Sequence, residues 1–138
     1  MNAPLYTTEI LRLAASLSDP RELDSPDGRA ELRSPTCGSR ITTTVKLDEQ
    51  GRVLALGQQV HACAFGQASA ALLEKGAAGR SRNDVGHALS ELTAWLDGSD
   101  AEPSWELAAL APARSRRSRH GAILLPFRAL LAAMEAAR

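Results

Sequence analysis

The stretch from residue 40 to residue 60 constrains the fold more than any other part of the chain. Its first half, Arg40–Leu47, is rich in β-branched residues and alternates in character, as a half-buried β-strand does. Residues 48–51 form a charged turn that ends in Gly51, and residues 52–60 predict a second strand. A weaker alternation at residues 30–34 predicts one more strand, before these two. Short strands joined by tight turns form an antiparallel sheet, which needs a helical layer over one face.

The rest of the sequence supplies that helical layer. Ser81 and Asp84 have the spacing of a capping box at a helix start, and Pro126 is tolerable only in the first turn of a helix. The predicted fold class is therefore α+β: a two-layer structure, with a three-stranded antiparallel sheet and helices packed on one face. Residues 1–138 are predicted to form a single domain. Helical periodicity places the helices at residues 5–17, 64–75, 82–96, a short segment around 105–110 that stops at Pro112, and 124–137.

The composition argues against several classes of function. The chain of 138 residues carries 16 basic and 16 acidic side chains, so it has no net charge to attract nucleic acid or an anionic membrane. No apolar run approaches the roughly 20 residues that span a bilayer, and the first residues lack the pattern of a signal peptide. The sequence also shows no catalytic triad, phosphate loop or paired carboxylates. We therefore expect a soluble, cytoplasmic protein that is not an enzyme and binds neither nucleic acid nor membrane.

The two cysteines are the candidate chemical groups. Cys37 lies in a tight turn between Pro35 and Gly38, and Cys63 lies where a predicted strand passes into a helix. Two cysteines do not make a disulfide framework in a chain of this length. A free cysteine is often a plain core residue, but both of these lie at the ends of elements. The helix start at Cys63, like Arg40 beside the turn, suits an anionic thiolate, the form that binds metal or accepts sulfur.

The segment Pro35-Thr36-Cys37-Gly38, the strands that follow it and Cys63 at the start of an Ala-rich helix resemble the NifU/IscU family of iron–sulfur cluster assembly scaffolds. The similarity covers roughly residues 30–75, and a weaker one continues at residues 119–124. The resemblance implies the same α+β fold and a labile iron–sulfur cluster bound through Cys37 and Cys63. It also implies a cysteine desulfurase and apo iron–sulfur client proteins as partners.

The chain departs from the pattern of that family in ways that reduce the ligand set. Ser39 stands at the position of an aspartate, Gly121 stands at the position of the third cysteine, and the chaperone-recognition string Leu-Pro-Pro-Val-Lys is absent. His120 is the best substitute as a third metal ligand, and His61 and Ser39 are further candidates. Two thiolates and an imidazole suit Zn²⁺ or a labile cluster better than a permanent redox centre. A monomer could supply this set, or a homodimer could pool four cysteines.

Three functions remain open at this point. A scaffold or carrier would bind iron, a labile cluster or zinc through Cys37 and Cys63. A sulfur acceptor for a cysteine desulfurase would take a persulfide on one of these cysteines without holding a cluster. A degenerate interaction module of the same fold would keep both thiols buried and unreactive. The arginines between residues 114 and 119 have no interleaved aromatic residues, so we expect them to dock an acidic partner or support the thiolates rather than bind RNA.

Overall fold

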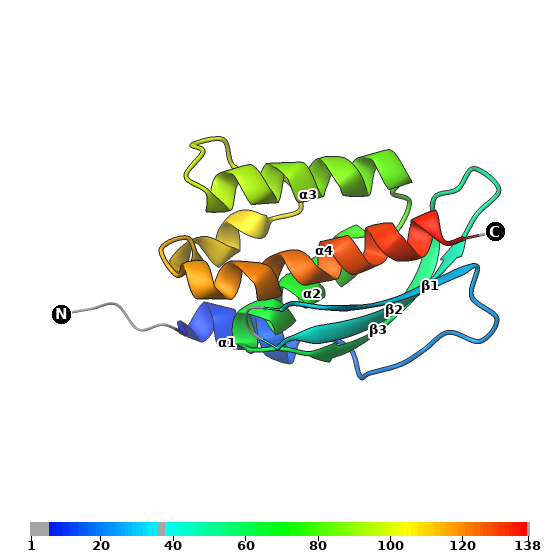
Figure 1. Ribbon diagram of the computed structural model, residues 1–138, viewed down its shortest axis with the longest axis horizontal. Coiled ribbons are helices and arrows are strands. Elements are labelled where there is room, and N and C mark those ends of the chain that lie inside the picture. Colours follow the sequence, from blue (N-terminus) through cyan, green and yellow to red (C-terminus); the bar gives the residue numbers. More distant parts are fainter. Residues whose placement is uncertain (1–5, 36–37, 138) are drawn as a thin grey trace.

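A computed structural model describes residues 6–35 and 38–137 of the chain (Figure 1). Its sheet has the order β1-β2-β3, and both neighbouring pairs are antiparallel. The α+β fold class and the three-stranded antiparallel sheet are therefore confirmed. The elements are α1 (Thr8–Ala15), β1 (Gly28–Arg33), β2 (Arg40–Leu47), β3 (Val53–His61), α2 (Ala64–Gly76), α3 (Arg82–Leu96), the 3₁₀ helices η1 (Leu107–Ala113) and η2 (Arg117–Arg119), and α4 (His120–Glu135).

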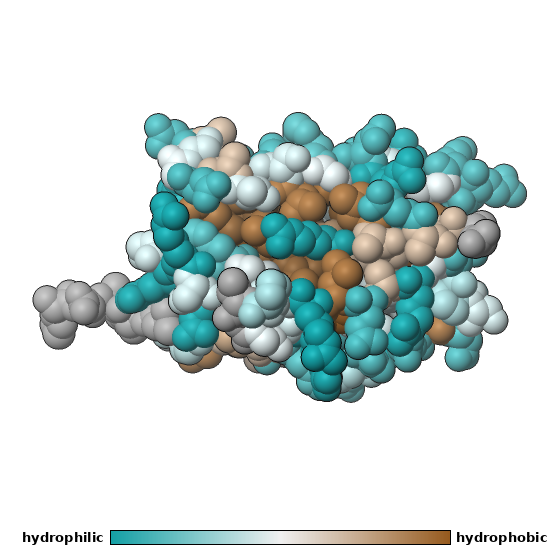
Figure 2. All heavy atoms as spheres, in the orientation of Figure 1, coloured by the Kyte–Doolittle hydropathy of each residue, from teal (hydrophilic) through white to brown (hydrophobic). Residues whose placement is uncertain are grey.

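Helices α2 and α4 cover one face of the sheet. α4 contacts β1 and β2, α2 contacts β3, and the two helices contact each other. Helix α1 packs on α2, whereas α3 packs on α4, on the side away from the sheet (Figure 1). Ten of the sixteen residues of α4 are buried, so this helix is the centre of the core. Figure 2 shows hydrophobic side chains gathered across the middle of this view, surrounded by hydrophilic ones.

The other face of the sheet is crossed at one end by the segment that joins α1 to β1. The Arg21 amide donates to the Gln58 carbonyl at 3.1 Å, and the Leu23 amide donates to Thr44 Oγ1 at 3.0 Å. Further on, the Asp27 amide donates to the Val45 carbonyl at 2.8 Å. These hydrogen bonds are made from the middle of β2 and β3 toward the β2–β3 turn. None of these three hydrogen bonds involves a residue at the opposite end of the sheet, where β1 passes into β2.

Helix α4 and strand β1 approach each other backbone to backbone. A Cβ atom added to Gly28 would overlap the carbonyl oxygen of Ala133 and lie 2.9 Å from its carbonyl carbon. Only a residue without a side chain fits this crossing, so Gly28 fixes how closely α4 lies on the sheet. None of the helices in the described part of the chain combines the length and the apolar character that a bilayer-spanning helix needs.

Helix α4 begins four residues earlier than the sequence predicts. The prediction placed Pro126 in the first turn of the helix because proline has no N–H to donate, but the helix starts at His120 and Pro126 lies inside it. The proline cannot donate to the carbonyl of Ala122, four residues earlier. That oxygen faces helix α2 instead and lies 3.2 Å from where a Cβ of Gly66 would be. Packing against α2 thus accommodates a proline that an isolated helix would exclude.

The segment before η1 is also different from the prediction. The sequence predicts helix from Trp105, but Trp105 and Glu106 have φ values of 64° and 60°, and the 3₁₀ helix begins only at Leu107. The indole of Trp105 packs against Phe127, with ring centroids 5.3 Å apart, and the Arg80 guanidinium lies 4.8 Å from its ring. These contacts hold a left-handed backbone that non-glycine residues rarely adopt. Pro112 was predicted to end the segment and lies inside η1.

The capping box of α3 forms as predicted. Ser81 Oγ accepts a hydrogen bond from the Asp84 amide at 3.1 Å, and Asp84 Oδ2 accepts one from the Ser81 amide at 2.9 Å. The backbone hydrogen bond from Ser81 holds the pKa of Asp84 below its ordinary value.

Replacing Ser81 with alanine removes this cap, and we expect the free energy of unfolding to fall by about 1 kcal/mol. Urea titration followed by circular dichroism measures the change. Ser90→Ala, at an exposed position of the same helix, is the matched control and should leave stability unchanged or slightly higher. Equal stability of the Ser81 and Ser90 variants would show that the cap contributes nothing.

Candidate metal and sulfur site

Cys63 is the N-cap residue of α2 and is half-buried. β3 ends at His61, so Cys63 lies outside the strand that carries this histidine. The Cys63 carbonyl accepts a hydrogen bond from the Gln67 amide at 3.0 Å, and Gln67 Nε2 donates to the Ala62 carbonyl at 3.0 Å. The thiol makes no capping hydrogen bond to the helix. Gln67 therefore fixes the backbone on both sides of Cys63 and leaves the sulfur out of these bonds.

The first turns of α2 and α4 are in direct contact. A Cβ on Gly66 would lie 3.3 Å from the Ala122 Cβ and 2.6 Å from the Ala62 Cβ, so the helices meet where Gly66 has no side chain. One turn further along, the buried Ser69 hydroxyl donates to the Ile123 carbonyl at 2.6 Å. Gly121 precedes Ala122 and is half-buried. The helix start that carries Cys63 and the helix start that carries Gly121 therefore lie at the same end of the molecule.

His120 is the first residue of α4, and its ring is held by the end of η1. The Nε2 atom lies 3.0 Å from the Ala113 carbonyl oxygen and 3.1 Å from that of Arg114. Both partners only accept hydrogen bonds, so Nε2 carries the proton and Nδ1 has the lone pair in the neutral ring. Histidines that bind metal commonly donate their second ring N–H to a backbone carbonyl in this way. The hydrogen bonds of His120 are thus compatible with ligation through Nδ1.

The turn between β1 and β2 is brought to the same end by the pairing of the strands. Arg40, the first residue of β2, is directly opposite His61, the last residue of β3. The Ser34 amide donates to the Ser39 carbonyl at 2.8 Å, and Gly38 has a φ of +73°, as the predicted tight turn requires. Cys37, which this turn carries, lies outside the described residues.

The remaining candidate ligands differ in exposure. His61 is exposed, whereas Ser39 is only 5% exposed. Within residues 6–35 and 38–137, no group of three or more His, Cys, Asp or Glu side chains is arranged to hold a metal ion. Cys63, His61 and His120 thus do not form a closed metal site by themselves. The ligand set of Cys37, Cys63 and His120 stays a prediction.

The arginines that precede α4 have two different environments. Arg114 donates from Nε to the Trp95 carbonyl and from Nη2 to the Ser99 carbonyl, both at 2.9 Å, and its guanidinium lies 4.8 Å from the Trp95 ring. It holds the loop after α3 and is structural. Arg116 and Arg117 are exposed at the start of η2. The predicted docking cluster is therefore smaller than the sequence suggested.

Sequence reasoning missed Gly66 and Gln67, which shape the surroundings of Cys63. A glycine inside an Ala-rich helix costs about 1 kcal/mol relative to alanine, so its presence indicates a close approach of another backbone. That signal could have identified Gly66. Gln67 has no comparable signal, because a glutamine one turn into a helix is ordinary. Tyr6 was also missed: its ring centroid lies 5.2 Å from that of Phe65 and packs the start of α1 beside the start of α2.

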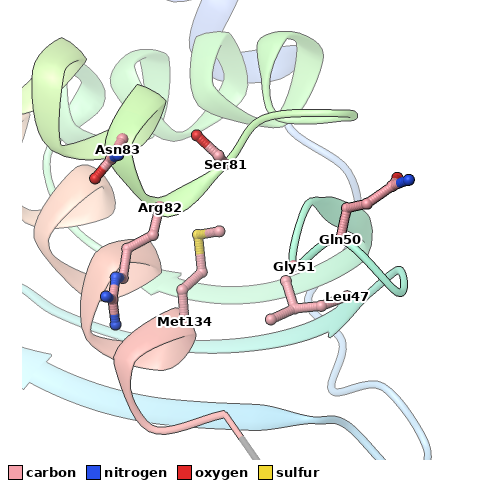
Figure 3. A pocket seen from close by; sticks show the side chains of 7 residues that line it. All are labelled: Leu47, Gln50, Gly51, Ser81, Arg82, Asn83 and Met134. Atoms are coloured by element: carbon pink, nitrogen blue, oxygen red, sulfur yellow. The ribbon is translucent and has the colours of Figure 1, made fainter.

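A separate hollow lies at the other end of the molecule (Figure 3). The N-terminal end of α3 and the side chain of Met134 form one side of it, and the β2–β3 turn forms the other. It contains neither cysteine nor histidine, and we assign no chemistry to it. Its lining residues are Leu47, Gln50, Gly51, Ser81, Arg82, Asn83 and Met134.

At the level of sequence, no protein-family model and no curated protein matches the chain. Solved structures share its fold over nearly its whole length. The N-terminal part of a nitrogen-fixing NifU-like protein from Brucella abortus has 27% sequence identity and a TM-score of 0.87, covering 96% of this chain and 93% of that one.

A second structure is that of a candidate iron–sulfur cluster assembly scaffold protein for the SUF system from Fervidobacterium islandicum. It has 16% identity and a TM-score of 0.84, covering 94% of this chain and 96% of that one, and at this identity it supports the fold alone. The resemblance to the NifU/IscU type, made from Cys37, Cys63 and the elements between them, is confirmed by these structures.

Proposed function

We propose that this protein is an iron–sulfur cluster assembly scaffold or carrier that binds iron, a labile cluster or zinc through Cys37 and Cys63. The observation that carries the proposal is the position of Cys63, at the N-cap of α2 and beside the start of α4, in a fold shared with a NifU-like domain. We further propose that residues 1–138 form one scaffold domain, which acts in the cytoplasm and is not an enzyme.

The chemistry of the available donors supports a cargo that is held loosely. Two thiolates and one imidazole leave at least one coordination position of iron or zinc to another ligand. We assign the imidazole to His120, whose Nε2 is occupied by the Ala113 and Arg114 carbonyls and whose Nδ1 remains for metal. A cluster with an incomplete protein ligand set is easier to pass on. The partners of such a scaffold are a cysteine desulfurase, which supplies sulfur, and apo client proteins, which receive the cluster.

Anaerobic reconstitution with iron and sulfide, and separately with zinc, tests this function. The unmodified protein should gain bound metal and, with iron and sulfide, visible absorption. Cys63→Ala and Cys37→Ala should each lose most of the bound metal and most of the visible absorption, because a site with one thiolate and one imidazole is too weak to retain the metal. His87→Ala is the matched control, since His87 is an exposed histidine on α3 and should not matter. Unmodified protein that stays free of metal after both treatments would contradict the proposal.

A second candidate function is that of a sulfur acceptor. Gly121, at the position of the third cysteine, offers no side chain to a metal, which favours a thiol that accepts sulfur without holding a cluster. In this reaction the thiolate of Cys63 or Cys37 attacks the outer sulfur of the desulfurase persulfide. A new S–S bond forms on the acceptor as the old one breaks, and the desulfurase cysteine leaves as a thiolate.

Mass spectrometry of the intact protein after incubation with a cysteine desulfurase and cysteine distinguishes the two functions. An acceptor gains the mass of one sulfur atom and contains no metal, and alkylation of its cysteines abolishes its stimulation of the desulfurase. Stimulation that survives alkylation would exclude the acceptor function.

A further inference from the structure

A row of basic side chains crosses the sheet at the end that carries the cysteines. Arg33 of β1 is directly opposite Arg40 of β2, which is directly opposite His61 of β3. Residues that are paired across antiparallel strands point to the same face of a sheet. The neighbouring row, Leu32, Ile41 and Val60, packs against Leu125 and Ala129 of α4. The row of Arg33, Arg40 and His61, which we call the basic row, therefore lies on the face away from the helices, and all three residues are exposed.

The basic row has no anionic partner within the part of the chain that the structure describes. The ion pairs formed there join Arg29 to Glu22, Arg52 to Asp84 and His87 to Glu91, and none of them includes a residue of the row. Like charges directly opposite each other on neighbouring strands are unfavourable. Arg29 differs from the arginines of the row: it lies on the same face of the sheet, but its Nε atom is 2.7 Å from Glu22 Oε1. Among the described residues, one arginine of this face is therefore ion-paired, whereas Arg33 and Arg40 beside the β1–β2 turn form no ion pair.

The place of the row connects it with the cysteines. Arg33 and Arg40 are the last and first strand residues on either side of the turn that carries Cys37, and His61 comes two residues before Cys63. The segment that crosses this face of the sheet makes its hydrogen bonds at Thr44, Val45 and Gln58, away from the row. Within the described part of the chain, a molecule bound to the basic row would therefore lie beside the β1–β2 turn and the end of β3 that leads to Cys63.

We propose that the basic row docks an acidic segment of the protein that exchanges sulfur or metal with Cys37 and Cys63. The identity of this partner rests on the proposed function, whereas the anion-binding surface rests on the paired arginines alone. A guanidinium binds a carboxylate through two parallel hydrogen bonds, so two adjacent arginines fit two carboxylates of one short segment. Such charges set the rate and the specificity of encounter between partners.

The surroundings of the row favour an acidic protein over a nucleic acid. Three adjacent strands span only about 10 Å, whereas nucleic-acid binding relies on many phosphate contacts along a groove. The described residues next to the row on the same face, Glu31, Thr42 and Gln59, also include no aromatic ring on which a base could stack.

Fluorescence anisotropy with a fluorescein-labelled deca-glutamate peptide tests the inference on the full chain. The unmodified protein should bind the peptide, and binding should weaken as salt is raised. The double variant R33E/R40E should bind at least about tenfold more weakly, because it replaces two attractive charges with repulsive ones. R82E/R128E is the matched control: it makes the same charge change at two exposed arginines, on α3 and α4, and it should bind as the unmodified protein does. R33Q/R40Q removes both charges without reversing them and should show an intermediate loss of peptide affinity. This variant replaces R33E/R40E in the test if the charge reversal impairs folding.

Two results would overturn the inference. One is an equal loss in R82E/R128E and R33E/R40E, which would mean that only the overall charge matters. The other is a labelled DNA decamer that binds at least as tightly as the peptide with the same dependence on Arg33 and Arg40, which would identify nucleic acid as the ligand. Metal loading of the same samples separates this inference from the proposed function. Unmodified protein that loads metal but does not bind the peptide would contradict the docking inference and leave the scaffold function standing. Unmodified protein that binds the peptide but never loads metal would contradict the scaffold function and leave the anion-binding surface standing.

Discussion

Replacing Gly121 with cysteine is expected to raise the affinity of the protein for zinc by about 100-fold. A structural zinc site with four ligands provides roughly 10–16 kcal/mol, so one added thiolate contributes about 3 kcal/mol, or two powers of ten. The contact between Gly66 and Ala122 places residue 121 at the same end of the helix pair as Cys63. Position 121 lies in the first turn of α4, where a cysteine can be accommodated without a left-handed backbone. Competition with a chromogenic chelator measures the affinity.

The control for this variant is Gly121→Ser, which adds a side chain of similar size without the thiol. It should bind zinc as weakly as the unmodified protein, and C63A/G121C should lose most of the gain because the new thiolate then has one fewer partner. If Gly121→Cys and Gly121→Ser bind zinc equally, residue 121 does not face the site, and the match to the family's third cysteine is wrong.

Replacing Gly28 with alanine is expected to destabilise the protein by about 3 kcal/mol, which for a chain of this length lowers the melting temperature by roughly 10 °C. The added methyl group would overlap the Ala133 carbonyl oxygen and lie 3.2 Å from the Ala137 amide nitrogen. Both are backbone atoms, which cannot rotate away as a side chain would. Relief requires α4 to move off β1, and α4 is the centre of the core. Thermal unfolding followed by circular dichroism measures the change.

Gly86→Ala is the matched control, because it adds the same methyl group inside α3 where nothing lies within 4 Å. It should stabilise the protein by about 0.5–1 kcal/mol, since alanine is the better helix former. A Gly28 variant that melts within a degree or two of the unmodified protein would show that the crossing of α4 and β1 is looser than the structure has it.

Local signals in the sequence were enough to predict most of the elements. The strand Arg40–Leu47 has the predicted bounds, and the capping box of Ser81 and Asp84 forms with both hydrogen bonds. In each case the residues that decide the structure are neighbours along the chain. The errors occur where distant residues decide. Pro126 was expected to mark a helix start because its tolerance inside α4 depends on packing against Gly66, and Trp105 was expected to be helical because its left-handed backbone depends on Phe127 and Arg80.

The candidate site shows the same division. The place of Cys63 at a helix start follows from the strand before it and the Ala-rich run after it, so the sequence predicts it. The contact between the starts of α2 and α4 joins residues far apart in the chain, so no local sequence pattern predicts it. The bonds from His120 to the Ala113 and Arg114 carbonyls are equally invisible in the sequence, because they depend on where η1 ends.

The meeting of Gly66 with Ala122 has a consequence for folding as well as for binding. Strands β1, β2 and β3 pair with their neighbours in the chain and can form early, whereas α4 must find α2 and β1 across a long separation. The site is therefore complete only in a chain whose last helix has docked. A ligand that joins Cys63 to the start of α4 closes a long loop and binds the folded chain in preference to the unfolded one. If the protein binds its cargo as proposed, loading would therefore stabilise the docking of α4.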